Sequence, residues 1–115
     1  MVIALMLDTL NIFKKPTLPT LRHAVVDGTV VAGAADTQRV DGYEYFPPDA
    51  INWDLLEASD RTSVCHWKGV ASYYDVVVDG HRLPAAAWSY NNPSDAAQHI
   101  AGHVAFWRGV KVVKS

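Results

Sequence analysis

Three Asp-Gly dipeptides divide this chain, and they restrict its possible folds more than any other feature. They are Asp27-Gly28, Asp41-Gly42 and Asp79-Gly80. Asp-Gly readily adopts the positive φ angles of a type I′ turn, which joins two antiparallel strands through a two-residue loop. Apolar or alternating stretches lie next to all three dipeptides. The sequence therefore predicts a mainly β protein, a small antiparallel domain.

The expected strands follow from these turns. Residues 24–26 pair with 29–31, residues 43–46 follow the second turn until Pro47-Pro48 ends them, and residues 70–78 pair with 85–90. Within residues 70–78, the face carrying Tyr74, Val76 and Val78, together with Ser72, is the predicted core face. A short helical turn is expected in residues 49–58 and a last edge strand at 110–113.

One helix is expected near the C-terminus, packed on the sheet. Asn92 is a suitable N-cap, Pro93 suits the first helical position, and Asp95 complements the helix dipole. Gly109 is a suitable residue to end this helix. The predicted apolar stripe consists of Ala96, Ala97, Ile100, Val104 and Trp107.

Composition limits the class of protein. Half of the 115 residues are apolar, which is enough for one core without disulfides. We expect an extended N-terminal arm in residues 1–22 and a single domain in residues 23–115. The formal charge of -2 and the lack of a basic run argue against nucleic-acid binding. The apolar N-terminal stretch is interrupted by Asp8 and is too short for a bilayer, so no membrane anchor is expected. With one cysteine, a reducing, cytoplasmic location is favoured.

The stretch from Cys65 to Lys68 indicates part of a functional site. A thiol, an imidazole, an indole and an ammonium follow one another, whereas an ordinary turn requires none of them. The preferred interpretation is a pocket for a small polar or anionic molecule, with large amphipathic walls. The predicted ligand-binding residues are Tyr45, Trp67, Lys68, Tyr73, Trp88, Ser89 and Tyr90. Trp53 and Trp107 are assigned to packing.

An enzyme is the main alternative, with Cys65 as nucleophile or redox thiol and Lys68 as the second catalytic residue. A buried, inert cysteine is the competing interpretation. His99 and His103 are spaced like metal ligands on a helix, but a polar helix edge explains them equally, and we assign neither a metal nor another cofactor. Open strand edges leave a homodimer possible.

Several motifs resemble one known family. Tyr45 to Asp49, the run from Cys65 to Tyr74, Trp88-Ser89-Tyr90 and Ile100-Ala101-Gly102 match, in order and spacing, the domain of unknown function numbered four-two-seven. The resemblance covers residues 23–113 and implies a β-tent-like domain with a helix on the sheet. In this chain His66 replaces the usual proline after the cysteine.

The family also carries a nucleotidyltransferase-like label. That chemistry normally uses paired carboxylates holding Mg²⁺ beside a loop that cradles phosphates. Asp75 and Asp79 are the candidate carboxylates, but Asp79 is explained by its turn and the sequence contains no Gly-rich phosphate loop before a helix. Nucleotide transfer is therefore the least favoured alternative.

Overall fold

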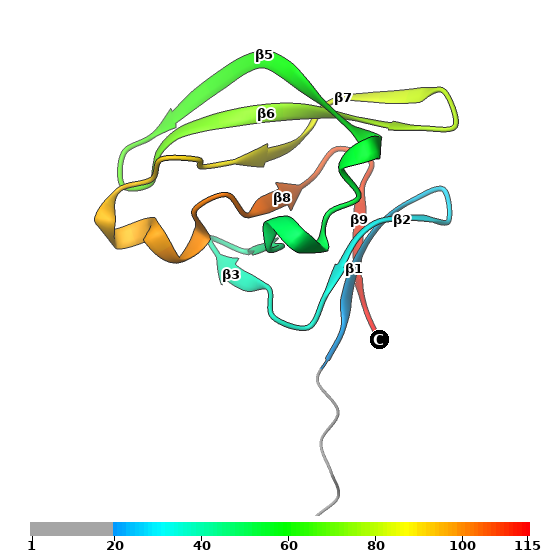
Figure 1. The fold of residues 1–115 in the computed structure, drawn as a ribbon, viewed down its shortest axis with the longest axis horizontal. Helices are drawn as coiled ribbons and strands as arrows, with labels where there is room; N and C mark the ends of the chain where they lie inside the picture. Colours follow the sequence, from blue (N-terminus) through cyan, green and yellow to red (C-terminus); the bar gives the residue numbers. More distant parts are fainter. Residues whose placement is uncertain (1–19) are drawn as a thin grey trace, which may run out of the picture.

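A computed structural model describes residues 20–115, and it is mainly β, as predicted (Figure 1). The strands in this part of the chain are β1 Arg22–Val26, β2 Thr29–Ala34, β3 Gln38–Val40, β4 Tyr43–Tyr45, β5 Leu56–Cys65, β6 Gly69–Val78, β7 His81–Ser89, β8 Val104–Phe106 and β9 Lys111–Lys114. Three short 3₁₀ segments are η1 Pro48–Ala50, η2 Trp53–Leu55 and η3 Asp95–Ile100. The predicted N-terminal arm lies outside the described residues, except for residues 20–22, of which Arg22 begins β1.

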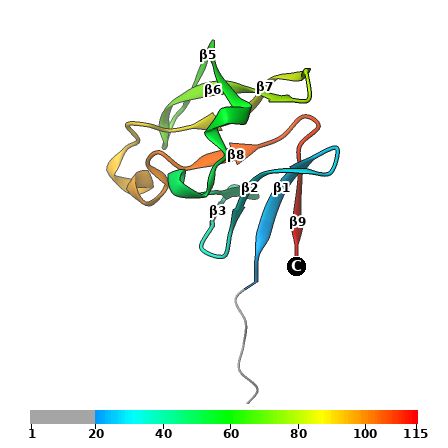
Figure 2. The same ribbon diagram turned by 45° about the vertical axis from the view of Figure 1, so that its right-hand side comes forward.

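The strands form three antiparallel groups. A four-stranded meander has the order β5-β6-β7-β8, a three-stranded sheet has the order β2-β1-β9, and β3 pairs with β4. Phe46 and Val104 exchange two backbone hydrogen bonds of 2.8 and 2.9 Å, which attach the β3–β4 hairpin to β8. Figure 1 shows β5 and β6 arching over one end of the molecule, while Figure 2 shows β1, β2 and β9 running together at the other.

All three Asp-Gly dipeptides form the predicted hairpin turns. They connect β1 to β2, β3 to β4 and β6 to β7. Both residues of each dipeptide have positive φ, as a type I′ turn requires, for example 51° at Asp41 and 85° at Gly42. The antiparallel layout is thus determined by local turn chemistry.

The meander separates two hydrophobic cores. Ala87 pairs with Phe106 and faces the first core, whereas the next pair, Trp88 and Ala105, faces the second. The first core consists of Ala24, Val26, Val31, Ala32, Phe46, Ile51, Leu56, Val76, Val78, Ala86, Ala87, Val104, Phe106 and Val110. The second core consists of Val40, Tyr45, Ala71, Tyr73, Ala85, Trp88, Tyr90, Ala97, Ile100 and Ala105.

Both faces of strand β6 are buried in part, whereas only one face was predicted to be in the core. Val76 and Val78 are buried in the first core as expected, but Ala71 and Tyr73, on the opposite face, are buried in the second. Ladder registers with both neighbours shift beside Tyr74, so the strand passes from one core to the other. Alternation alone does not reveal that a strand contributes opposite faces to two cores.

The prediction of a C-terminal helix is wrong. Residues 95–100 form only the short η3 segment, preceded by Ser94 rather than Asn92, and Ala97 has non-helical angles (φ -115°, ψ 16°). The chain then turns at Gly102 (φ 69°), and residues 104–106 pair with β7 as β8. Strand pairing buries Val104 and Phe106 completely or nearly so, which outweighs the helical spacing of the apolar residues.

The remaining predicted elements differ in detail. Residues 49–58 contain two 3₁₀ turns, after which β5 begins at Leu56. The last edge strand exists as β9, but it pairs with β1 instead of continuing the meander. Within residues 20–115, no helix has both the length and the apolar character that crossing a bilayer requires.

Candidate functional site

A hollow of about 170 Å³ opens on the second-core side of the meander. The β3–β4 hairpin, the turn between β5 and β6, and strands β6 and β7 all contribute to it. Its lining consists of Asp41, Tyr43, Tyr45, Lys68, Tyr73, Trp88, Tyr90 and Trp107. Six aromatic rings and one pair of opposite charges therefore meet at one cavity.

Lys68 and Asp41 form the charged part of the hollow. The Lys68 ammonium donates a hydrogen bond to Oδ2 of Asp41, although the lysine side chain is only 7% exposed and the aspartate side chain 54%. Lys68 Nζ also lies 5.0 Å from the ring centre of Trp67 and 5.5 Å from that of Tyr90, within cation–π range. A buried cation is thus held by one carboxylate at the rim and by two aromatic faces.

The electrostatics keep this pair ionised. Burial opposes the charge on Lys68, but the hydrogen bond to Asp41, with smaller contributions from the ionisable groups of Tyr90, Tyr45 and Cys65, more than offsets burial, and the pKa of Lys68 is raised. The hydrogen bond from Lys68 is the main reason that the pKa of Asp41 is lowered. At neutral pH the hollow therefore contains an ammonium and a carboxylate.

Trp88 is at the centre of the aromatic wall. Its ring meets Tyr43 and Trp107 edge to face, with 4.9 and 5.3 Å between ring centres, and Tyr45 at 6.2 Å. Its indole N–H donates to the Tyr45 hydroxyl at 3.1 Å. Such edge-to-face pairs fix ring orientation, so the wall is preorganised.

The hydroxyls of Tyr45 and Tyr90 are hydrogen-bonding groups that stay neutral at neutral pH. Burial raises the pKa of Tyr90 to about 12 and also raises the pKa of Tyr45. The Tyr73 hydroxyl is paired with Ser63 Oγ at 2.9 Å. Tyr45 accepts from Trp88, and within residues 20–115 its own O–H has no acceptor.

Trp107 is a wall residue that the sequence assigned to packing. Its indole N–H donates to the carbonyl of Ala85 at 2.7 Å, and its backbone N–H donates to Ala86 at 2.9 Å. The predicted helix would place Trp107 on a packing stripe. In the structure Trp107 follows β8 directly and lines the hollow. Trp53, in contrast, packs edge to face on Tyr74 at 5.6 Å, outside the hollow.

The structure brings together five of the seven predicted ligand-binding residues, namely Tyr45, Lys68, Tyr73, Trp88 and Tyr90. Trp67 lies beside them, half-exposed, with its ring under the Lys68 ammonium. Ser89 does not reach the hollow, because it is fully buried and donates to Asn91 Oδ1 at 3.1 Å.

Asp41 and Tyr43 also line the hollow, and sequence reasoning missed them. The turn formed with Gly42 is a sufficient reason for an aspartate at position 41, so the sequence does not mark Asp41 as a lining residue. For Tyr43 a signal existed, since it shares a strand face with Tyr45 by period-two alternation.

Cys65 ends β5 next to the hollow but outside its lining. It is partly buried against the second core. Burial would raise the pKa of its thiol, but the backbone N–H groups of Lys68 and Trp67 and the Lys68 charge more than compensate, so the pKa is lowered. The thiol is therefore more readily ionised than an ordinary cysteine, and it is not among the residues that line the cavity.

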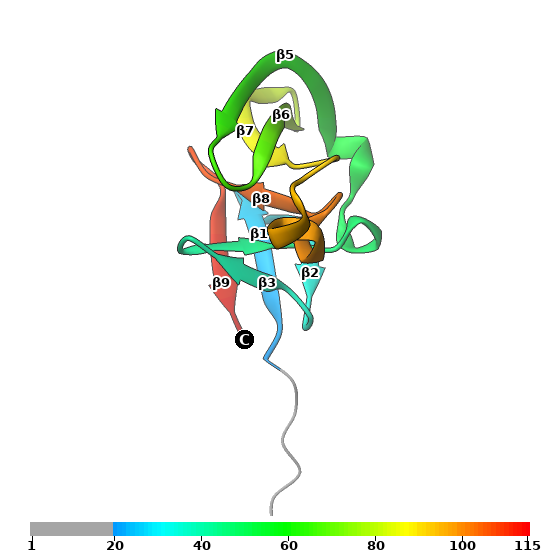
Figure 3. The same cartoon turned by 90° about the vertical axis from the view of Figure 1, so that its left-hand side faces the viewer.

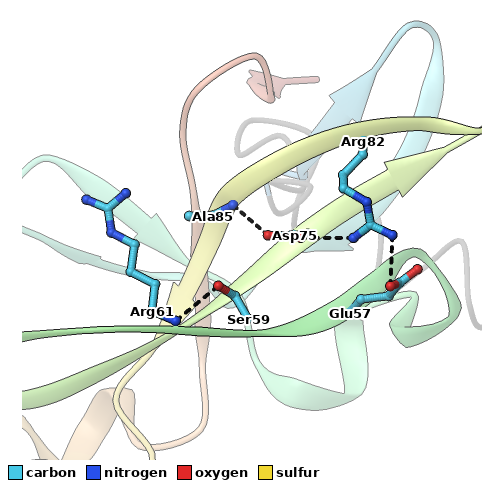
Figure 4. A network of polar contacts seen from close by, with 6 residues as sticks. All are labelled: Glu57, Ser59, Arg61, Asp75, Arg82 and Ala85. Atoms are coloured by element: carbon cyan, nitrogen blue, oxygen red, sulfur yellow. Dashed lines mark hydrogen bonds and ion pairs between the residues drawn. The ribbon is translucent and has the colours of Figure 1, made fainter.

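The two carboxylates considered for nucleotide transfer are not a pair. Asp75 accepts hydrogen bonds from the Ala85 backbone N–H at 2.8 Å and from Arg82 at 2.9 Å, and Arg82 also binds Glu57 at 3.0 Å (Figure 4). Asp79 is the first residue of its turn. Asp75 thus supports the backbone of β7, and its oxygens are already engaged.

The two histidines considered as metal ligands do not share a helix face. His99 is exposed at the end of η3, and His103 Nδ1 lies 3.1 Å from the Ala101 carbonyl oxygen. In residues 20–115, no three side chains of the His, Cys, Asp or Glu type gather as a metal site would require.

Fold and site together define a small antiparallel β domain with an aromatic hollow around a buried lysine. Residues 19–114 match the family described as Domain of unknown function (DUF427), and the chain belongs to this family, as the sequence motifs indicated. A comparison with curated proteins finds no match for this chain.

Proposed function

We propose that the aromatic hollow binds a small ring-shaped molecule that carries an anionic or strongly polar group. The observation that carries this proposal is the Lys68 ammonium, which is nearly buried in the cavity wall. The Asp41 carboxylate keeps this ammonium charged, and a nearly buried ammonium that is still charged can bind an anionic group strongly. A negatively charged ligand group would complete its environment.

The size and walls of the hollow favour a single ring. An apolar cavity of about 150 Å³ holds benzene, and the present hollow of about 170 Å³ is slightly larger. Aromatic side chains on several sides offer faces and edges to a flat ligand. A six-membered ring with one polar substituent matches this space.

The available donors indicate the substituent. An ammonium has three N–H bonds, and Asp41 occupies one of those of Lys68. Among the contacts of residues 20–115, the Tyr45 hydroxyl only accepts, so its hydrogen can be donated to a ligand. A carboxylate, with two acceptor oxygens, is suited to two such donors.

Benzoate and its neutral counterpart benzamide provide the test. We expect benzoate to raise the melting temperature and to quench tryptophan fluorescence, because Trp88 and Trp107 line the hollow. Benzamide should bind more weakly. The proposal is wrong if benzoate and substituted benzoates leave both signals unchanged at millimolar concentration.

A matched pair of variants locates the effect. Lys68→Met should abolish the response to benzoate, whereas Lys111→Met, at an exposed lysine of β9, should keep it. Lys68→Arg keeps the charge and should respond if Lys68→Met fails to fold. An equal response in Lys68→Met and in the unmodified chain would contradict the proposed role of the ammonium.

A second candidate function is thiol chemistry at Cys65, favoured by the lowered thiol pKa. The rate of alkylation by iodoacetamide, followed against pH, should reach half its maximum below the ordinary thiol value of 9.0. The same chain in urea is the control, and Lys68→Met should move the midpoint upward. A folded-state midpoint at or above the urea value would exclude an activated thiol.

The remaining sequence-based interpretations stay predictions. Nucleotide transfer gains no support from Asp75 and Asp79, because Asp75 is engaged by Arg82 and Ala85. A homodimer through β9 is compatible with its position at the end of a sheet. The cytoplasmic location and the β-tent-like topology rest on the sequence alone.

A further inference from the structure

A second hollow, of about 210 Å³, lies between the β1–β9 ribbon and the β3–β4 hairpin. Figure 3 shows β3 crossing in front of β1 and β9. Arg22, Arg39, Glu44 and Lys114 provide its charged walls, and Phe106 and Val112 provide apolar surface. The proposed ring-binding hollow uses none of these six residues.

Positive charge is in excess among the lining residues. Arg22 of β1 and Lys114 of β9 are direct cross-strand partners, a like-charge arrangement that is unfavourable by itself. Glu44 is the carboxylate in the lining, and its oxygens lie 3.3 Å from Arg22 Nε and 2.7 Å from Arg39. One buried carboxylate is therefore shared by two arginines, and Lys114 adds a third positive charge to the same lining.

Hydrogen bonding at this hollow is incomplete. Glu44 is already engaged, since it also accepts from the Thr37 hydroxyl at 2.6 Å. Arg22 Nε is buried and, within residues 20–115, has no hydrogen-bond partner of acceptable geometry. Buried polar atoms without a partner are rare, and a bound ion or water is a common explanation.

We propose that this second hollow binds a phosphate group, either as inorganic phosphate or as a small phosphate monoester. Arginine forks match the tetrahedral oxygens, and a dianion would compensate the excess positive charge. The cavity is larger than one phosphate requires, and Phe106 and Val112 could contact a small apolar ester group. The lining of this site shares only Tyr43 with the ring-binding hollow.

Inorganic phosphate, compared with chloride at equal ionic strength, is the first probe. Phosphate should raise the melting temperature and shift the backbone NMR signals of residues 22 and 114, which are paired across β1 and β9. Lys114→Gln and Arg39→Gln should each weaken phosphate binding about tenfold. Lys111→Gln is the matched control, because strand alternation directs residue 111 away from the face of Val112 and Lys114.

A further variant separates binding from a general salt effect. Glu44→Gln removes the competing negative charge, so phosphate affinity should rise about tenfold even if the fold loses stability. Phosphate stabilises many proteins without binding a site. Equal thermal shifts in Lys114→Gln, Arg39→Gln and the unmodified chain, or an affinity that falls in Glu44→Gln, would overturn the proposal. A small monoester that binds more tightly than phosphate would identify the apolar contact.

Discussion

Trp88 donates its indole N–H to the hydroxyl of Tyr45 at 3.1 Å, although 43 residues separate the two in the chain. Both side chains are almost completely buried. The bond ties β7 to β4 across the second core and fixes two walls of the ring-binding hollow. It therefore links the stability of the domain to the shape of its candidate site.

Replacing Tyr45 by phenylalanine should cost about 1–3 kcal/mol of unfolding free energy, because the buried indole N–H of Trp88 loses its acceptor. Urea denaturation followed by tryptophan fluorescence measures the change. Tyr43→Phe is the control, since Tyr43 is 38% exposed and its hydroxyl can remain hydrated. Similar losses in the two variants would contradict a special role for the Tyr45–Trp88 bond.

Tyr90 should make the domain sensitive to alkaline pH. Its folded pKa of about 12 lies above the ordinary value of 10.0, so the unfolded chain releases this proton first. The contribution to stability is complete below pH 10 and is lost as the pH rises towards 12. Unfolding free energies measured by urea denaturation between these limits should decline more steeply in the unmodified chain than in Tyr90→Phe.

An absorbance titration of tyrosinate provides an independent check. The tyrosine that ionises near pH 12 should be missing from Tyr90→Phe. Identical titration curves for the two proteins would show that Tyr90 is not the late-ionising group.

Asp75 should matter through the backbone of β7. It accepts the N–H of Ala85, whose φ of 50° is uncommon for a residue with a side chain. Asp75→Ala should cost about 1–3 kcal/mol, because a buried N–H loses its partner. It should also alter tryptophan fluorescence, because the Ala85 carbonyl accepts from Trp107.

Glu57→Ala is the matched control for Asp75. It removes the other carboxylate bound to Arg82 but leaves Ala85 untouched (Figure 4). Because this ion pair is exposed, the expected loss is below about 1 kcal/mol. A loss as large as that of Asp75→Ala would show that Arg82, and not Ala85, mediates the effect.

The hairpins were predictable because their determinants are local. Asp27-Gly28, Asp41-Gly42 and Asp79-Gly80 each specify a turn within two residues, independently of the rest of the chain. The clustering of Lys68 with Tyr73, Trp88 and Tyr90 followed from motifs on neighbouring strands.

The failures have nonlocal causes. Val104 and Trp107 have helical spacing with Ile100, yet residues 104–106 pair with β7, and this pairing determines their conformation. Asp41 binds Lys68, which lies 27 residues away in the chain, and no pattern within the hairpin predicts that contact. Trp107 reaches the hollow only because β8 replaces the expected helix.

The run Ala85-Ala86-Ala87 lies between the two cores, with neighbours packed on either side. A larger side chain at Ala86 or Ala87 would overpack the first core, and one at Ala85 the second. Adaptation of the hollow to a different molecule would therefore proceed through exposed rim residues such as Tyr43, because Asp41 holds the Lys68 ammonium. In this domain, the alanine run behind the hollow is fixed by the architecture, and changes in selectivity are expected at the entrance.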